Sequence, residues 1–460
     1  MITIIISSIL VICYFLIATE RLTNINKAAV AVFAGTVAWV LYISYGADFV
    51  EESHMLDYQN FLGDMQPSSD LVKDYIWGHV FLPCVGHCSE VVLFLLATMT
   101  IVEILHNNGC FDFLSVWLRT KNSRLLMWKL AAFTFIMSAN LDNISTTVMM
   151  LVVMNSILPR SKDRIVYGSV VVLAANFGGV STVIGDPTTL VLWNKGAITA
   201  TNYTLALFIP CMLGWMLPTY FISRTLKGSV ELDRPTLPYR GDDTNLKVWQ
   251  RLVMFVIGIG GLWFIPTFHN ITHLSPFLGA FCVLSVLWIV NEIFNRKIMN
   301  IDRRLTRSIP QQLQYSIIQL MLYVMGIMLA VYVVGEIGAL SWLTEQVGIY
   351  VDNIWVLGIF SGVISMVLDG FATSMSMITM YDVASGANIA DNLPFVQDGI
   401  YWRMISYSTT VGSSIFAFAS LAGIVYLKTE RVGVLWYLRH VGVYVALAGV
   451  IGLAILWLTV

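Results

Sequence analysis

Two short polar stretches, Ser138-Ala-Asn-Leu-Asp142-Asn143 and Ser365-Met-Val-Leu-Asp369-Gly370, interrupt long apolar runs in this chain. Both have a serine, a leucine and an aspartate at the same spacing, and both are soon followed by two hydroxyl side chains. An aspartate in the hydrocarbon core of a bilayer costs about 2.5–3.5 kcal/mol even on insertion scales. Two of them in matching contexts therefore indicate a transport pathway or a binding site.

The composition of the 460 residues is that of a polytopic membrane protein, with 57% hydrophobic and 12% charged residues. The formal net charge is −2, and we expect the lipid bilayer, and no nucleic acid, as the partner of its surface. The six cysteines lie mostly in apolar runs, where buried free thiols are common. The first apolar stretch lacks the basic start and cleavage site of a signal peptide, so we expect a retained helix.

Stretches of about 20 apolar residues, the length that a bilayer core requires, predict ten membrane helices. They cover residues 2–19, 28–45, 79–105, 165–193, 203–223, 252–268, 274–294, 313–334, 400–427 and 434–458. Two further apolar stretches, 125–160 and 351–382, contain the polar interruptions quoted above and do not fit this pattern.

The charges that flank these two stretches predict re-entrant hairpins. Basic residues precede and follow 125–160, so the positive-inside rule places both of its ends in the cytoplasm. Acidic residues flank 351–382, which is therefore expected to enter from the outside. The other basic clusters, among them Arg21 with Lys27, place both termini and the acidic loop 46–78 outside.

The resulting order is an internal repeat of opposite topology, in which each repeat holds a helix, a hairpin, a broken helix and a last helix. Inverted repeats with broken helices are typical of secondary transporters, whose substrate site lies near the membrane midplane. The predicted parts are an N-terminal helix pair with its acidic loop (1–78), a first repeat (79–223), a linking helix pair with basic cytoplasmic segments (224–312) and a second repeat (313–460). The two parts outside the repeats are expected to form a scaffold or a dimer contact.

The broken helices differ in their polar residues. The first repeat reads Asn176-Phe-Gly-Gly179 and then Gly185-Asp186-Pro187-Thr188-Thr189, and the second reads Thr409-Thr410-Val-Gly412-Ser413-Ser414 and then Ser420-Leu-Ala-Gly423. Glycine and proline at membrane depth release backbone carbonyls, which is tolerated where they line a cavity. The second break has hydroxyl groups but no acid, so Asp186 has no acidic counterpart.

Hairpin tips and helix breaks together are expected to bring Asp142, Asp186 and Asp369 close to amide and hydroxyl oxygens. Such oxygens suit a small hard cation. Burial disfavours the charged form of a carboxyl group, so protons can compete with the cation for the same oxygens. The residues therefore predict cation/proton antiport, in which Asp142 and Asp186 bind either the cation or protons.

Several of these motifs resemble those of the NhaD-type sodium/proton antiporters, over roughly residues 75–455. The similar stretches are the first hairpin motif, both helix breaks, Gly86-His-Cys-Ser-Glu90 and Thr100-Ile-Val-Glu103. The resemblance implies the ion transporter superfamily, with inverted repeats, re-entrant hairpins and frequent homodimers. It also implies export of Na⁺, often also Li⁺, in exchange for H⁺ at a bacterial cytoplasmic membrane, without a cofactor.

The resemblance also implies the site residues. Candidate cation or proton ligands are Ser138, Asp142, Asn143, Asn176, Asp186, Thr188, Thr189, Ser365, Asp369, Ser414 and Ser420, with Na⁺ at Asp142 and Asp186. His87 and Glu103 match positions linked in the family to pH response or transport. One departure stands out, because the family usually has an asparagine where this chain has Gly370, and this leaves ion preference, stoichiometry and electrogenicity open.

Other readings compete with antiport. Each aspartate could instead be a hydrogen-bonded clamp of a turn, and His87 could be an ordinary interfacial histidine. The same superfamily contains sodium-coupled carboxylate importers and oxyanion exporters, but the Ser-Asn-Thr hairpin motifs of the importers are absent here. An intramembrane aspartyl protease also uses two membrane acids, yet its Gly-x-Gly-Asp pattern is missing from the break at Asp186. We therefore expect a transporter and not an enzyme.

Overall fold

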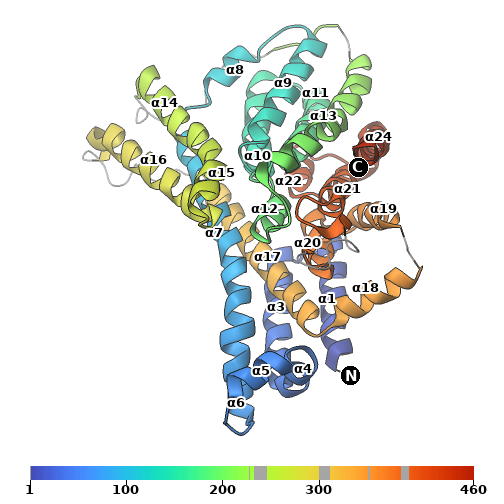
Figure 1. The fold of residues 1–460 in the computed structure, drawn as a ribbon. Coiled ribbons are helices and arrows are strands. Elements are labelled where there is room, and N and C mark those ends of the chain that lie inside the picture. Colours follow the sequence, from blue (N-terminus) through green and yellow to red (C-terminus); the bar gives the residue numbers. More distant parts are fainter. Residues whose placement is uncertain are drawn as a thin grey trace.

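Helices of two lengths make up the protein, long ones that can cross a bilayer and short ones that pair as hairpins or continue after a break (Figure 1). The structure is a computed structural model, and it describes residues 2–226, 228–232, 246–299, 311–350, 353–384 and 393–459. Most of the predicted basic segment 295–312 lies outside these residues. Over the described ranges, no strand is present beyond two isolated bridges.

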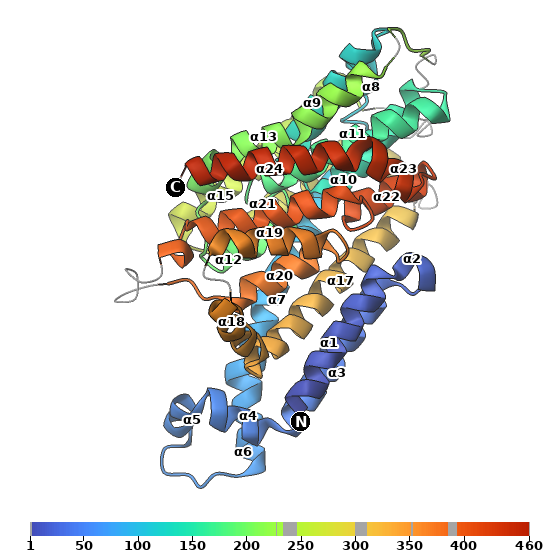
Figure 2. The ribbon, with the colours of Figure 1, turned by 90° about the vertical axis from the view of Figure 1, so that its right-hand side faces the viewer.

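The N-terminal helices pack against the second repeat. The first is α1 (Ile2–Ala18), and the short α2 (Glu20–Thr23) leads to α3 (Lys27–Ser44). Figure 2 shows α1 and α3 side by side with α17 (Gln311–Glu336), the first helix of the second repeat. A Cβ atom on Gly35 would lie 2.9 Å from the carbonyl oxygen of Gly326, so glycine lets the backbones of α3 and α17 approach closely.

The acidic segment 46–78, expected as a loop, is instead largely helical. It forms α4 (Gly46–Ser53), α5 (Met55–Leu62) and α6 (Ser69–Tyr75), and α6 continues through η1 (Ile76–Phe81) into α7 (Leu82–Asn107). The resulting helix of 39 residues, Ser69–Asn107, contains the predicted boundary between residues 78 and 79. Acidic side chains do not prevent helix formation when they face outward, and the side chain of Ser68 caps the start of α6.

Both re-entrant stretches are helical hairpins. The first consists of α9 (Ser123–Ser138) and α10 (Asn143–Ile157), and the second of α19 (Ile354–Ser365) and α20 (Gly370–Met380). At ~1.5 Å per residue, the 12 residues of α19 span about 18 Å, which is too short to cross a bilayer core of about 30 Å. The two motifs have the same spacing, which places the aspartate at the start of the second arm in each hairpin.

The helix after each hairpin is broken at the predicted place. In the first repeat α11 (Ser161–Val180) stops and α12 (Pro187–Asn194) resumes, and in the second α21 (Ile400–Ile415) is followed by α22 (Leu421–Thr429). The side chains of Asp186 and Ser420 cap the resumed helices, since each accepts a hydrogen bond from a backbone N–H of its first turn. Asp186 and Ser420 thus occupy equivalent positions.

The remaining helices complete the repeats and the link between them. The first repeat ends with α13 (Ala200–Arg224). The second ends with a continuous run of α23 (Val434–Tyr437), η5 (Leu438–Gly442) and α24 (Val443–Leu458). The link holds α14 (Val248–Phe255), η2 (Val256–Gly260), α15 (Gly261–Thr272) and α16 (Pro276–Met299). Of these, α14, η2 and α16 pack on α7, and α15 packs on α16. Two short helices that were not predicted, α8 (Phe113–Trp117) and α18 (Ala339–Tyr350), precede the two hairpins.

Seven helices in the described part of the chain are long and apolar enough to cross a membrane. The other three predicted helices are α1, with 17 residues, and the two broken ones. The predicted fold class, an all-α membrane protein of inverted repeats with hairpins and broken helices, is confirmed. Its two repeats meet where the hairpin tips face the helix breaks, because α10 packs on α22 and α12 on α20.

Candidate functional site

The two hairpins dock on the broken helices through equivalent hydrogen bonds. Ser138 Oγ donates to the backbone oxygen of Ala175 on α11 at 2.6 Å, and Ser365 Oγ donates to that of Thr409 on α21 at 2.7 Å. Both serines are fully buried. The serine of each sequence motif therefore fixes the end of the first hairpin arm against its neighbour, a structural role that the repeated spacing did not by itself reveal.

Glycines complete this docking. A Cβ atom on Gly178 would lie 2.5 Å from the backbone oxygen of Phe135, and one on Gly412 would lie 2.0 Å from that of Gly362. Real Cβ atoms do not approach other heavy atoms so closely. The glycines of the two breaks thus allow backbone-to-backbone contact between hairpin and broken helix, and this contact brings the polar tips together.

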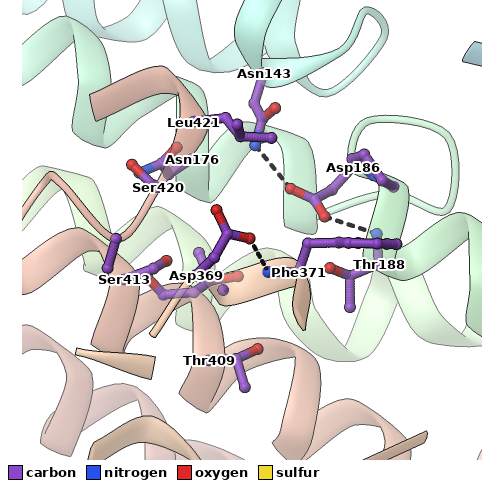
Figure 3. Close-up of a pocket in the computed structure, with 14 residues that line it drawn as sticks. Asn143, Asn176, Asp186, Thr188, Asp369, Phe371, Thr409, Ser413, Ser420 and Leu421 are labelled. Carbon is purple, nitrogen blue, oxygen red and sulfur yellow. Dashed lines mark hydrogen bonds between the residues drawn. The ribbon is translucent and has the colours of Figure 1, made fainter. Parts of the chain in front are cut away.

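A cavity of about 40 Å³ lies where the tips and breaks meet (Figure 3). This volume accommodates an ion or a very few water molecules. Both repeats line it, with α10, α11 and α12 on one side and α20, α21 and α22 on the other. The lining residues are Asn143, Asn176, Asp186, Pro187, Thr188, Asp369, Gly370, Phe371, Thr409, Thr410, Ser413, Ala419, Ser420 and Leu421.

Asp186 is fixed in the cavity by two donors. Its Oδ1 accepts a hydrogen bond from the Thr188 backbone N–H at 2.9 Å, and its Oδ2 accepts one from Asn143 Nδ2 at 2.7 Å (Figure 3). Asn143 therefore points its amide nitrogen toward the carboxylate. Its own Oδ1 is buried and finds no hydrogen-bond partner among the described residues.

Asn176 joins the two repeats beside the same cavity. Its Nδ2 donates to Ser414 Oγ at 3.0 Å and to Ser420 Oγ at 3.1 Å, so the second repeat uses both amide hydrogens. The Oδ1 atom is left buried and, within the described part of the chain, without a partner. Two residues that line the cavity with Asp186 thus have amide oxygens without a hydrogen-bond partner in the described part of the chain.

Asp142 lies at the tip of the first hairpin. Its Oδ1 accepts hydrogen bonds from the backbone N–H groups of Ile144 at 3.0 Å and Ser145 at 2.7 Å, which caps α10. Its Oδ2 is buried, and the described residues offer it no donor. A buried carboxylate oxygen without a donor is costly, so this atom calls for a cation or a proton.

Asp369 occupies the same place in the second hairpin but has a different partner. Its Oδ1 accepts a hydrogen bond from the Phe371 backbone N–H at 3.0 Å, and its Oδ2 lies 2.8 Å from Lys27 Nζ. The Lys27 side chain is only 11% exposed and the Asp369 side chain only 5%. The Lys27 ammonium group also lies over the ring of Tyr323, 4.4 Å from its centroid.

The position of Lys27 corrects its assignment to a basic cluster at the cytoplasmic surface. It begins α3 and is buried against the second hairpin, because α3 packs tightly on α17 and points its first turn at the tip. A long lysine side chain at the end of an apolar helix usually reaches the interface instead. In the sequence, the burial of Lys27 is indicated only by its position next to an apolar stretch.

The structure divides the eleven candidate ligands into two groups. Six line the cavity, namely Asn143, Asn176, Asp186, Thr188, Asp369 and Ser420. The others, Ser138, Asp142, Thr189, Ser365 and Ser414, are outside the residues that line it and hold hairpins, caps or amides in place. Three hydroxyl residues of α21 also line the cavity, Thr409, Thr410 and Ser413, which the motif of the second break contained but the list of candidate ligands did not.

The three aspartates that were expected to lie close together do not all line the cavity. Asp186 and Asp369 share the cavity lining, and Asp142 lies beyond it. Among the described residues, no three His, Cys, Asp or Glu side chains are placed to hold one metal ion. Neutral amide, hydroxyl and backbone oxygens therefore make up most of the ligands that the cavity offers.

A second cavity, of about 420 Å³, lies at the other ends of the same two short helices, α12 and α20. His87 lines it, together with Lys195, Glu336 and Asp382. Glu103 lies on α7 outside the lining of both cavities, and its Oε1 is buried without a partner in the described ranges. The two residues that the resemblance linked to pH response thus lie apart from the first cavity.

Comparison with known proteins agrees with this architecture. A family model described as "Citrate transporter" matches residues 2–397. The chain belongs to the citrate transporter family. The crystal structure of the YdaH transporter of Alcanivorax borkumensis has a similar fold, with a TM-score of 0.58, 13% identity, and coverage of 93% of this chain and 98% of that one.

Sequence relatives of this member of the citrate transporter family are named as sodium/proton antiporters. "Sodium/proton antiporter 2" of Arabidopsis thaliana is 29% identical over 354 residues, 77% of this chain and 81% of that protein. "Na(+)/H(+) antiporter NhaD" of Alkalimonas amylolytica is 24% identical over 450 residues, 92% of this chain and 83% of that protein. The resemblance to NhaD-type proteins is therefore confirmed.

Proposed function

We propose that the protein is a secondary transporter that exports Na⁺ in exchange for H⁺. The observation that carries the proposal is a pair of unpartnered amide oxygens on residues that line a cavity of ion size together with Asp186. Asn143 Oδ1 and Asn176 Oδ1 have no donor among the described residues, and both residues line the cavity with Asp186. Oxygens of these types suit a small hard cation.

Exchange of Na⁺ for H⁺ follows from the energetic cost of leaving the carboxylate charges without a bound cation or proton. Asp142 is buried, and its Oδ2 has no donor in the described part of the chain. Asp186 is half-buried and lines the cavity. A carboxylate charge held away from bulk water is unfavourable unless a positive charge balances it, so each of the two carboxylates binds either the metal cation or a proton. Arrival of Na⁺ on one side of the membrane then displaces protons, and their return on the other side displaces Na⁺.

Alternating access follows from the position of the cavity between the repeats. Each repeat contributes a hairpin tip and a helix break to it, so a rocking of one repeat against the other changes which side can reach it. The second cavity, at the far ends of α12 and α20, is the proposed entrance from the outside. Its lining is polar and includes Glu336 and Asp382, which lie 2.8 Å from His54 and 3.5 Å from Lys195 respectively.

Organic-anion transport is the second candidate, because the matching family model is described as a citrate transporter. The cavity favours a cation for two reasons. Its volume of about 40 Å³ is far below the roughly 300–1,000 Å³ of sites for organic ligands. The described lining contains no basic side chain, and of its two carboxylates only Asp369 is paired with a lysine, Lys27, so an anion would meet repulsion from Asp186.

The finer parts of the proposal concern place and assembly. We expect the bacterial cytoplasmic membrane, both termini on the outside and a homodimer. The distribution of basic residues supports the orientation. The linking helices α14 and α16 pack on α7, and no residue of α14–α16 lines the cavity, which suits these helices to a dimer contact.

Proteoliposomes with an internal pH dye test the function. An outward Na⁺ gradient should drive proton uptake in the wild type, and Li⁺ should do so as well, whereas citrate should not. Asp186→Asn should lower the rate to that of empty liposomes. Asp70→Asn is the matched control, because Asp70 has a 93% exposed side chain far from the cavity lining. Unchanged exchange in Asp186→Asn, or exchange driven by citrate alone, contradicts the proposal.

A further inference from the structure

The second hairpin holds a cation that belongs to the protein itself. We propose that the Lys27 ammonium group is a tethered cation, which takes at Asp369 the place that the transported cation takes at the first hairpin. The protein would then bind one Na⁺ per chain although its two repeats have the same architecture. This inference rests on the proposed function, because it presumes that Na⁺ binds near the first hairpin.

The two hairpin aspartates are equivalent by position and by hydrogen bonding. Asp142 and Asp369 each cap the second arm of a hairpin, with one carboxylate oxygen on backbone N–H groups. In each hairpin the serine four positions earlier donates to a backbone oxygen of the broken helix. The second carboxylate oxygen, Oδ2, is therefore in a comparable position in the two repeats.

The partners of these two Oδ2 atoms differ. Asp142 Oδ2 is buried, and no described residue donates to it. Asp369 Oδ2 lies 2.8 Å from Lys27 Nζ in a pair that is almost completely buried. One site is thus left open for a positive charge from solution, and the other is already neutralised by a charge on α3.

Several contacts hold Lys27 where it is. The close approach of Gly35 and Gly326 fixes α3 on α17, and the Tyr323 ring of α17 packs against the ammonium group. The N-terminal helices also hold the hairpin itself, because the hydroxyl of Tyr14 on α1 lies 2.6 Å from Ser376 Oγ on α20. The cation is therefore attached to the same helices that anchor the hairpin.

Two further differences remove cation ligands from the second repeat. The position equivalent to Asn143 is Gly370, which has no amide, and the position equivalent to Asp186 is Ser420, which has no charge. A cation at Asp369 would therefore have fewer ligands than one at the first hairpin and would bind more weakly. A fixed ammonium group accounts for the paired Oδ2 of Asp369, for Gly370 and for Ser420. It supplies the positive charge that Asp369 needs, so a complete set of cation ligands is not required there.

Equilibrium binding of ²²Na⁺ to the purified full-length protein tests the inference. The wild type should saturate at one Na⁺ per chain. Lys27→Gln should saturate at two, and Lys27→Gln with Asp369→Asn should return to one, because the second ion needs the freed carboxylate. Lys428→Gln, which removes a 63% exposed lysine, is the control and should remain at one.

The outcomes separate the inference from the function on which it rests. Two Na⁺ per chain in the wild type, or a folded Lys27→Gln protein that still binds only one, overturns the tethered cation while exchange continues. If Lys27→Gln does not fold, the test uses the wild type and the double variant Lys27→Gln with Asp369→Asn. One Na⁺ per chain in each protein supports the inference, and two in either protein contradicts it. Absence of both Na⁺ binding and exchange in the wild type refutes the proposed function.

Discussion

The two hairpin tips have the same fold and different chemistry. Asp142 and Asp369 both begin a short helix by accepting backbone hydrogen bonds, and that task uses one of their two carboxylate oxygens. The other oxygen is unpartnered within the described chain in Asp142 and paired with Lys27 in Asp369. A motif that has the same structural role in both repeats therefore has a different charge partner in each.

The largest expected difference between the tips is in transport. Asp142→Asn should reduce exchange to the background of empty liposomes, because the carboxylate charge is lost while asparagine still caps the helix. The neutral pair Lys27→Met with Asp369→Asn should retain at least about a tenth of the wild-type rate, a barrier change of at most ~1.4 kcal/mol. Initial rates in proteoliposomes measure both, and equal losses at the two tips would contradict the comparison.

Stability should show the opposite order. Asp369→Asn leaves Lys27 buried without its partner, and such a change costs about 3–5 kcal/mol. Asp142→Asn should cost less than ~1 kcal/mol, since asparagine and aspartate cap helices about equally well. Thermal unfolding of the solubilised proteins compares them. Adding Lys27→Met to Asp369→Asn should recover most of the loss, and no recovery would mean that the pair is not coupled.

Much of this arrangement could be predicted from the sequence because its signals are local. Polar residues, glycine and proline inside apolar runs mark the hairpin tips and the breaks, and the flanking charges separate a hairpin from a crossing helix. The ion pair gives no such signal. Lys27 and Asp369 are 342 positions apart, and they meet only because α3 packs on α17.

The candidate site shows the same limit at closer range. The motifs identified the residues of the tips and breaks, including Asp186 and Asn176, but not which of them face the cavity. Whether a residue faces the cavity depends on the direction of its side chain, and packing between segments of different repeats sets that direction. The short helices of segment 46–78 were missed for a related reason, since their acidic composition resembles that of an outer loop.

The glycines of the two breaks should have effects of intermediate size, equal in both repeats. Gly178→Ala and Gly412→Ala each place a methyl group against a hairpin backbone oxygen, which should cost about 1–3 kcal/mol of stability. Gly86→Ala is the control, because no atom lies within 4 Å of its added Cβ among the described residues. Thermal unfolding measures the three, and a loss at one break alone would mean that the hairpins dock differently.

The smallest expected effect concerns the anchor that only the second hairpin has. Tyr14→Phe removes the hydrogen bond to Ser376 and should cost about 1 kcal/mol of stability. Tyr45→Phe, at a position with an exposed side chain, should cost nothing measurable. Unfolding temperatures compare the two variants, and equal values would show that the contact with α1 does not stabilise the hairpin.

Proton release on addition of Na⁺ to the detergent-solubilised protein tests the central claim most directly, because it needs no gradient and no second substrate. In weak buffer near neutral pH, the wild type should release protons as Na⁺ binds, whereas Asp142→Asn and Asp186→Asn should release markedly fewer. Equal release from all three proteins, or none from a wild type that binds Na⁺, would contradict competition between Na⁺ and protons at these carboxylates.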